Sequence, residues 1–168
     1  MKHFFTVLIC ISITGIAASQ SRKDSLLREL SGILNKAAGA GWKDQTVTKT
    51  IVTQTLSGNS ITLVLKEKGY FLDEAIDRTT TTTYRFVWES LNKISVRPPD
   101  NPFSLAGCNK ADNYCKYQLN FPDKQVSLSR NNGKPETTSW FYVYIRPADK
   151  ERYFACLQQL HAVLNPGK

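Results

Sequence analysis

Two stretches of the chain repeat apolar residues at the spacing of an amphipathic helix. Between residues 22 and 37 the apolar positions fall three or four residues apart, and charged side chains lie on the other side. This periodicity predicts a helix with one face packed against the rest of the protein. Ser21 is suited to be its N-cap, and the Gly/Ala run at 38–41 ends it. A second stripe over residues 149–164, followed by Pro166, predicts a C-terminal helix.

Seven segments between these helices have the pattern of short β-strands. They alternate in polarity or are rich in Thr, Val and aromatic residues, and turn residues separate them. The Ser-Gly-Asn-Ser sequence at 57–60 and the Asn-Asn-Gly-Lys sequence at 131–134 predict tight turns, because Asn and Gly tolerate positive φ. A hairpin is also expected across 122–124, and residues 70–78 are expected to be irregular. The expected strands are residues 46–56, 61–68, 79–88, 93–97, 116–121, 125–130 and 137–146.

This order of elements resembles the pleckstrin-homology-like architecture, in which two antiparallel sheets form a partly open barrel that a C-terminal helix plugs. The resemblance rests on element order and on the closing strand around 140–145, which leads into the last helix. It implies a mainly β fold: a seven-stranded antiparallel barrel with a C-terminal helix, here with an extra N-terminal helix. The alternative is a cystatin-like α+β fold, in which a curved antiparallel sheet wraps on a helix. The helix-first order suits that alternative.

The resemblance carries no ligand to this chain. Phosphoinositide-binding members of the family place Lys and Arg across the first hairpin. Here the loop at 57–60 is uncharged, and the nearby cations are only Lys49, Lys66 and Lys68. Because one fold supports many functions, no binding residues are transferred from the family.

Residues 1–19 have the pattern of a secretory signal peptide. A basic start at Lys2 precedes an apolar run at 4–13, and small residues at 17–19 offer a cleavage site before Gln20. The apolar run is shorter than the roughly 20 residues of a membrane-spanning helix. We therefore expect a signal peptide at 1–19, a helix and Gly/Ala linker at 20–41, and an antiparallel β domain with its C-terminal helix at 42–168. The mature chain would have no transmembrane segment and would be exported, either periplasmic or extracellular.

Three cysteines remain in the expected mature chain, and three pairings are open. A Cys108–Cys115 disulfide is favoured because both residues lie in one polar loop. In the chain-entropy model, closing so short a loop stabilises a fold by about 2–3 kcal/mol. Cys156 falls on the apolar stripe of the last helix and is interpreted as a small buried residue; a free reactive thiol is the alternative.

The composition argues against most kinds of chemistry. The chain has 168 residues, 41% of them hydrophobic, with 22 Lys+Arg against 14 Asp+Glu, which fits a globular protein and not a disordered or multi-pass membrane protein. His3 lies in the expected signal peptide, so His161 would be the one histidine of the mature chain and a paired-histidine metal site is excluded; the cysteines lack zinc-site spacing. We find no nucleophile elbow or glycine-rich phosphate loop. We therefore assign no catalytic, cofactor or metal-binding residues.

One acidic cluster supports an alternative function. Asp73, Glu74 and Asp77 lie close together in the sequence. A pair of carboxylates can act as general acid and base in glycoside cleavage, so the alternative function is a glycan-directed hydrolase with an acidic site near 73–77. A solvated acidic loop is the other interpretation.

The last strand carries the candidate ligand-binding residues. Because strand side chains alternate between faces, Phe141, Val143 and Ile145 would face the core. The opposite face would then hold an aromatic row, and soluble proteins seldom leave such a row bare. The N-terminal helix could instead cover it. The candidate ligand-binding residues are Trp140, Tyr142 and Tyr144.

These patterns favour an exported, non-enzymatic binding or interaction domain. Its positive charge is spread along the second half of the chain without a basic run. Such a surface suits weak, salt-sensitive binding of an anionic polymer, and a protein partner is equally open. No nucleic-acid partner is expected outside the cytoplasm.

Overall fold

The computed structural model describes residues 20–72, 74–91, 107–109, 113–121 and 124–166. The expected signal peptide and the expected strand at 93–97 lie outside these residues. The described strands form a six-stranded sheet with the order β1-β2-β3-β4-β7-β8 and a three-stranded sheet with the order β5-β6-β9. The strands are β1 (Gly41–Asp44), β2 (Val47–Ser57), β3 (Ser60–Phe71), β4 (Glu74–Arg85), β5 (Gly107–Asn109), β6 (Tyr114–Asn120), β7 (Val126–Arg130), β8 (Glu136–Thr138) and β9 (Trp140–Ile145).

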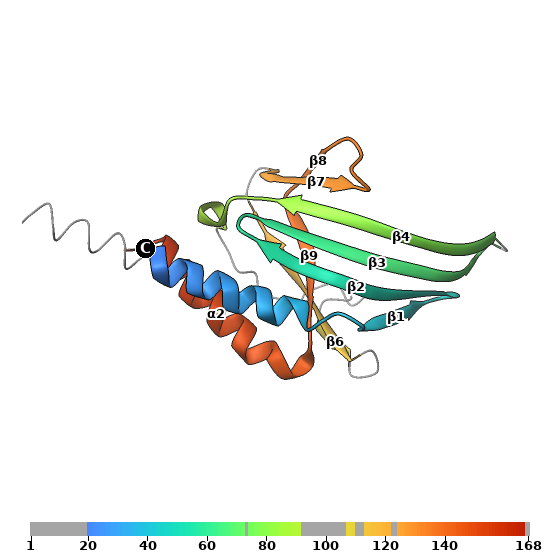
Figure 1. Cartoon of the computed structure of the whole chain (residues 1–168), viewed down its shortest axis with the longest axis horizontal. Coiled ribbons are helices and arrows are strands. Elements are labelled where there is room, and N and C mark those ends of the chain that lie inside the picture. Colours follow the sequence, from blue (N-terminus) through green and yellow to red (C-terminus); the bar gives the residue numbers. More distant parts are fainter. Residues whose placement is uncertain (1–19, 73, 92–106, 110–112, 122–123, 167–168) are drawn as a thin grey trace, which may run out of the picture.

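Two helices lie side by side against the sheets (Figure 1). The first covers residues 20–35 as described, and the second is α2 (Lys150–Leu164). A short 3-10 turn, η1 (Trp88–Ser90), follows β4, and a second one, η2 (Pro147–Asp149), precedes α2. Both apolar stripes are buried in one core with the sheets, which confirms the two predicted helices. The helix residues in that core are Leu26, Leu30, Ile33, Leu34, Tyr153, Cys156, Leu157 and Leu160.

The fold is mainly β, antiparallel, with an N-terminal and a C-terminal helix, as expected. The sheet does not close into a barrel: its edge strands β1 and β8 are not paired with each other. It forms instead a curved sheet on helices, the arrangement of the α+β alternative. The element order remains compatible with a pleckstrin-homology-like arrangement.

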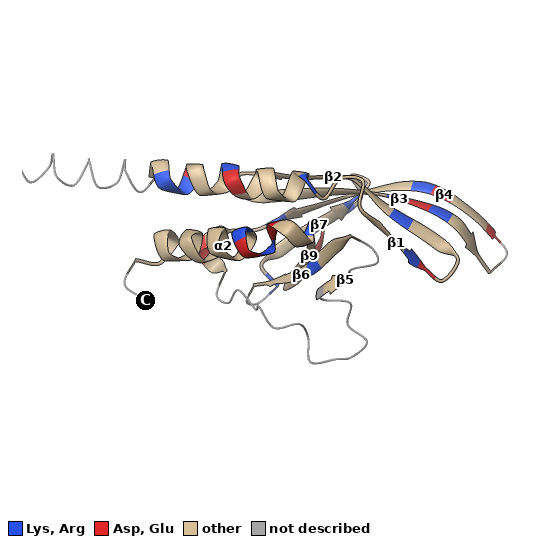
Figure 2. Cartoon of the chain, turned by 90° about the horizontal axis from the view of Figure 1, so that it is seen from below, with Lys and Arg blue, Asp and Glu red and all other residues tan. Residues whose placement is uncertain are grey.

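Strands β2, β3 and β4 form a long meander. The turn at 57–60 joins β2 to β3 as predicted, with Ser57 opposite Ser60 and Gly58 at φ 54°. The expectation of an irregular segment at 70–78 is wrong for its described strand residues: β3 and β4 pair without a break from Ser60–Arg85 to Phe71–Glu74. The far ends of these strands extend beyond the helices and curve to one side (Figures 1 and 2).

Two other predictions about the strands are wrong. The strands on either side of 122–124 do not form a hairpin, because β6 pairs with β9 in one sheet and β7 pairs with β4 and β8 in the other. The expected strand at 137–146 is two strands, β8 and β9, separated at Ser139. Ser139 marks the point where the chain crosses from one sheet to the other.

The predicted disulfide is present. Cys108 and Cys115 are directly opposite each other on β5 and β6, and their sulfur atoms are bonded. Cys156 is free and buried, and its thiol donates a hydrogen bond to the carbonyl of Leu26 over 3.3 Å. Among the described residues, no helix is long and apolar enough to cross a membrane.

Candidate binding site on the concave face

The curvature of the six-stranded sheet gives its projecting part an inner, concave face. The register sets Val47, Gly69 and Ile76 opposite one another on adjacent strands, so Val47 and Ile76 point to the same side. Phe71 lies on that side at the end of β3. These apolar residues line a pocket of about 470 Å³ together with charged side chains from β1 to β4.

The charged residues of this pocket form a chain of ion pairs. Glu67 accepts from Nε of Arg78 over 2.5 Å and lies 3.6 Å from Nζ of Lys49. Lys49 also reaches Asp44 over 3.2 Å. The register explains the chain, because Lys49, Glu67 and Arg78 are cross-strand neighbours. Partly exposed pairs of this kind add little stability, but they orient charges across the pocket wall.

Gly69 permits the close approach of the turn between β1 and β2. Its φ is +151°, and a Cβ atom there would lie 2.1 Å from the carbonyl oxygen of Thr46. The hydroxyl of Thr46 also donates to the carbonyl of Tyr70. A side chain at position 69 would therefore push away the turn that closes one end of the pocket.

The three residues of the predicted aromatic row share one face of the small sheet but differ in depth. Trp140 is 44% exposed, Tyr142 is half-buried and Tyr144 is only 5% exposed. The rings of Trp140 and Tyr142 meet edge to face at 5.1 Å. Tyr144 lies beneath Trp42 of β1, with stacked rings 5.2 Å apart. The open part of the row is thus Trp140 and Tyr142.

The N-terminal helix does not cover the row as a whole. Its apolar face packs in the main core with α2, and only the segment that follows the helix reaches Tyr144, through Ala37 and Ala40. Tyr144 is therefore buried against Trp42, whereas Trp140 is exposed at the other end of the row.

Lys116 joins the aromatic row to the charged pocket. Its ammonium lies 3.8 Å from the centre of the Tyr142 ring, a cation–π contact. Burial lowers the pKa of Lys116, the charge of Lys49 lowers it further, and the Asp44 carboxylate opposes both. Lys116 lies opposite Tyr144 on β9, Tyr144 is stacked on Trp42 of β1, and Trp42 lies opposite Lys49 on β2. The aromatic row therefore adjoins the β1–β2 end of the ion-pair chain.

The residues of the acidic cluster do not converge. Glu74 lines the pocket on the inner face of β4, whereas Asp77, an odd number of positions along the strand, points to the outer face and lies 3.8 Å from Lys66. Asp73 lies outside the described residues. Glu74 and Asp77 therefore do not flank a common bond from the same side of the sheet.

Sequence reasoning assigned no site role to most residues of this face, among them Trp42, Phe71, Ile76 and Lys116. Phe71 lies two positions after Gly69, and Ile76 lies two positions before Arg78, which is the spacing of residues on one face of a strand. The acidic residues between Phe71 and Arg78 obscured this signal. Trp42 and Lys116 carry no local signal, because partners from distant strands define their roles. Within the described ranges, no group of three or more His, Cys, Asp or Glu side chains could hold a metal ion.

Comparison with known proteins gives no relative: no protein-family model, no curated protein and no solved structure matches the chain.

Proposed function

We propose that this protein is an exported, non-enzymatic binding domain that holds an acidic polysaccharide on its concave face. The observation that carries the proposal is the arrangement of Lys116, Tyr142 and Trp140. An exposed indole, a half-buried phenol ring and an ammonium group lie in sequence along one side of the small sheet.

The chemistry of a sugar acid matches these three groups. Aromatic rings offer large, rigid apolar surfaces against which the C–H faces of sugar rings can lie. Lys116 and the neighbouring Lys49 provide positive charge for a carboxylate or sulfate group. The carboxylates of Asp44, Glu67 and Glu74 on the adjoining pocket wall can accept hydrogen bonds from sugar hydroxyls. The excess of basic over acidic residues further favours an anionic ligand.

Export is part of the proposal. The predicted signal peptide and the Cys108–Cys115 disulfide both support it, since disulfides persist in oxidising compartments. Expression of the full chain in a secreting host, followed by mass spectrometry of the exported protein, tests it. We expect an N-terminus at Gln20; retention of the whole chain inside the cell would contradict export. The pleckstrin-homology-like comparison remains a hypothesis about the fold and adds no ligand.

Calorimetric titration of residues 20–168 tests ligand binding. The probes are a uronic-acid polysaccharide and a neutral polysaccharide of equal length, each at low and high salt. We expect binding of the acidic polymer that weakens with salt. Trp140→Ala and Lys116→Gln should each weaken it roughly tenfold, which is about the loss of one good aromatic or charged contact.

Two exposed positions elsewhere provide matched controls. Tyr70→Ala removes an exposed aromatic ring, and Lys68→Gln removes an exposed ammonium, both from the outer face of β3. These variants should bind like the wild type. If Trp140→Ala and Lys116→Gln also bind like the wild type, the concave face is not the site. Release of reducing ends during the titration would favour the hydrolase alternative instead.

A further inference from the structure

We propose that the free edge of β4 pairs with the same edge of a second copy of this chain, so that two copies form one continuous antiparallel sheet. β3 covers one side of β4 over its whole length. On the other side β7 pairs only with Thr82 to Arg85. Along the projecting part, from Glu74 to Thr80, none of the described strands occupies that edge (Figure 1).

The backbone of this edge points outward in a regular pattern. The N–H of Thr81 donates to Oδ1 of Asn131, and the carbonyl of Thr81 accepts from the N–H of Asn131, both over 2.8 Å. Thr81 therefore directs its backbone groups toward the β7 side. Because these directions alternate along a strand without a bulge, Ala75, Asp77 and Thr79 present their N–H and C=O groups to the same side. All three residues are exposed, and an edge of this length is a template for another strand.

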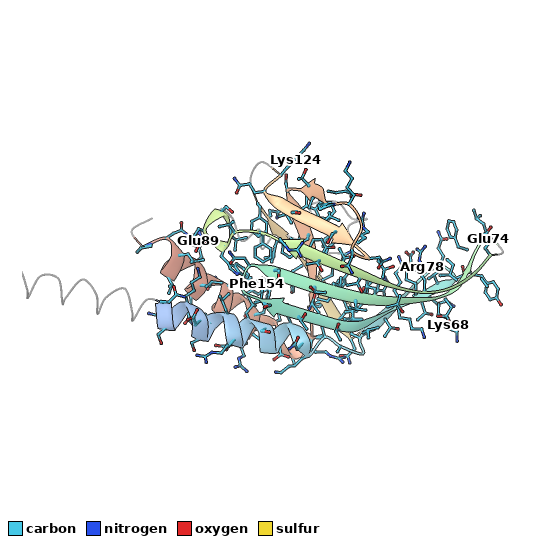
Figure 3. The ribbon with its side chains drawn as sticks, turned by 45° about the horizontal axis from the view of Figure 1, so that its top comes forward. Lys68, Glu74, Arg78, Glu89, Lys124 and Phe154 are labelled. Carbon is cyan, nitrogen blue, oxygen red and sulfur yellow. A yellow bond between two sulfur atoms is a disulfide. The ribbon has the colours of Figure 1, made fainter. Side chains whose placement is uncertain are left out.

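The charged side chains of β4 favour one register for pairing with its own copy. In such a ladder, a residue whose backbone N–H and C=O point to the free edge must lie opposite a residue of the same kind. A ladder centred on Asp77 would oppose two aspartates, and a ladder centred on Arg78 would oppose two arginines, which is unfavourable for like charges. A ladder centred on Ile76 instead places the two Ile76 side chains together and sets Glu74 of each copy opposite Arg78 of the other. Figure 3 shows Glu74 and Arg78 on this projecting part of the strand.

The length of the free edge matches the same register. With Ile76 at the centre, Leu72 of the second copy lies opposite Thr80. The partner's hairpin thus ends just before Thr81, where the bonds to Asn131 begin. Pairing leaves β7 in place and makes use of the full free edge.

This dimer would join two concave faces. The two-fold axis of an antiparallel strand pair centred on Ile76 is perpendicular to the sheet, so both inner faces point the same way. Glu74, Ile76 and Arg78 line the pocket in each copy. The two pockets would adjoin at the axis. The proposed dimer does not depend on the identity of the ligand.

Sedimentation velocity over a concentration series tests the proposal. We expect a reversible monomer–dimer equilibrium for the wild type. Glu74→Arg or Arg78→Glu alone converts both cross-strand ion pairs into repulsive pairs, which should raise the dissociation constant roughly tenfold or more. Mixing the two variants should restore the dimer, because in the mixed pair both cross-strand contacts join an arginine of the Glu74→Arg copy to a glutamate of the Arg78→Glu copy. Lys68→Glu, on the outer face, should leave the equilibrium unchanged.

A cross-link checks the register independently of stability. Ile76→Cys places two thiols at a directly opposed, non-hydrogen-bonded pair, where Cα atoms are about 4.5 Å apart, within the range of a disulfide. Mild oxidation should give a covalent dimer. Ala75→Cys, one residue away, should cross-link much less. A wild type that remains monomeric at all concentrations, or a dimer that tolerates both charge reversals, would overturn the proposal; equal cross-linking at positions 75 and 76 would overturn the register.

Discussion

The side-chain amide of Gln54 bonds to both backbone groups of Tyr144 and so replaces a neighbouring strand for β9. Oε1 of Gln54 accepts from the N–H of Tyr144 over 2.9 Å, and Nε2 donates to the carbonyl of Tyr144 over 2.6 Å. Nε2 also donates to the carbonyl of Leu34 over 3.2 Å. Through these bonds one side chain connects β2, β9 and the end of the N-terminal helix. Gln54 is fully buried, so water cannot replace the bonds.

Replacing Gln54 by Leu should destabilise the protein by about 2–3 kcal/mol, because buried backbone groups of Tyr144 would lose their partners. Urea unfolding followed by circular dichroism measures the change. Thr55→Val on the exposed face of the same strand is the control, and it should change stability by less than about 0.5 kcal/mol. Equal stability of the two variants would show that the Gln54 bonds contribute nothing net.

Gly32 offers a stabilising substitution. It is exposed within the N-terminal helix, and a Cβ atom there would meet nothing within 4 Å. Gly32→Ala should therefore raise the free energy of unfolding by about 0.5–1 kcal/mol, the difference in helix propensity. Gly39→Ala is the matched contrast: its φ is +79°, so the same added methyl group should destabilise. Thermal melts of both variants check the opposite signs.

The elements that could be predicted from sequence have local signals. The two helices follow from their apolar stripes. The turns follow from residues that tolerate positive φ: Gly58, Asn131 and Asn132 all adopt it, at 54°, 49° and 57°. The Cys108–Cys115 disulfide follows from its short loop. In each case the chain within a few residues decides the structure.

The assignment of strands to sheets could not be predicted in this way. β6 and β7 are separated by a short connection, yet Leu119 and Val126 meet in the same core from two different sheets. Packing of distant residues, not the connection, determines their partners. The candidate site shows the same limit. Alternation placed Trp140 and Tyr144 on one face, but Tyr144 is buried by residues from distant parts of the chain, among them Trp42 and Ile51.

Gly69 should be intolerant of any side chain. Gly69→Ala would bring a methyl group within 2.1 Å of the Thr46 carbonyl and 2.9 Å of the Val47 Cα atom, at a φ of +151°. We expect a loss of at least about 1–3 kcal/mol from backbone strain and a displaced turn between β1 and β2. Hydrogen exchange should show faster exchange at that end of β2. Gly58→Ala, where a Cβ atom meets nothing within 4 Å, should cost less and leave exchange there unchanged.

Cys156 should make stability depend on alkaline pH. Burial raises the pKa of its thiol to about 11 from an ordinary 9.0, with a smaller contribution from Glu29. A raised native pKa contributes stability that is complete below pH 9 and is lost as the pH rises through 11. The loss amounts to about 2–3 kcal/mol. Cys156→Ala should lose less stability than the wild type between pH 9 and 11, as urea unfolding at a series of pH values would measure.

Thiol labelling gives a second check on Cys156. A buried, protonated thiol reacts slowly, so the native protein at pH 8 should react with a disulfide reagent only on unfolding. Burial also raises the pKa of Tyr144 and Tyr153, so part of the alkaline loss is common to both proteins. Only the difference between wild type and Cys156→Ala belongs to the thiol. Identical pH profiles, or rapid labelling of the native protein, would contradict this prediction.

Trp140 should account for most of the fluorescence that acrylamide can quench. Trp88 is fully buried and its indole N–H donates to the carbonyl of Gly58 over 2.9 Å, while Trp42 is stacked on Tyr144. Trp140→Phe should therefore remove the strongly quenched emission. Trp88→Phe should leave it in place and remove a protected, blue-shifted component instead.

The same measurement connects Trp140 to the proposed ligand. A saturating acidic polysaccharide should protect the wild type from quenching, because a sugar ring on the indole excludes acrylamide. In Lys116→Gln, Trp140 itself remains exposed, so quenching without polymer should match the wild type while protection by the polymer is weakened. Loss of protection in Lys116→Gln but not in Lys68→Gln would tie the ammonium over Tyr142 to binding at Trp140. Equal protection in both variants would mean that the polymer reaches the indole without Lys116, and the acidic character of the ligand would have to be withdrawn.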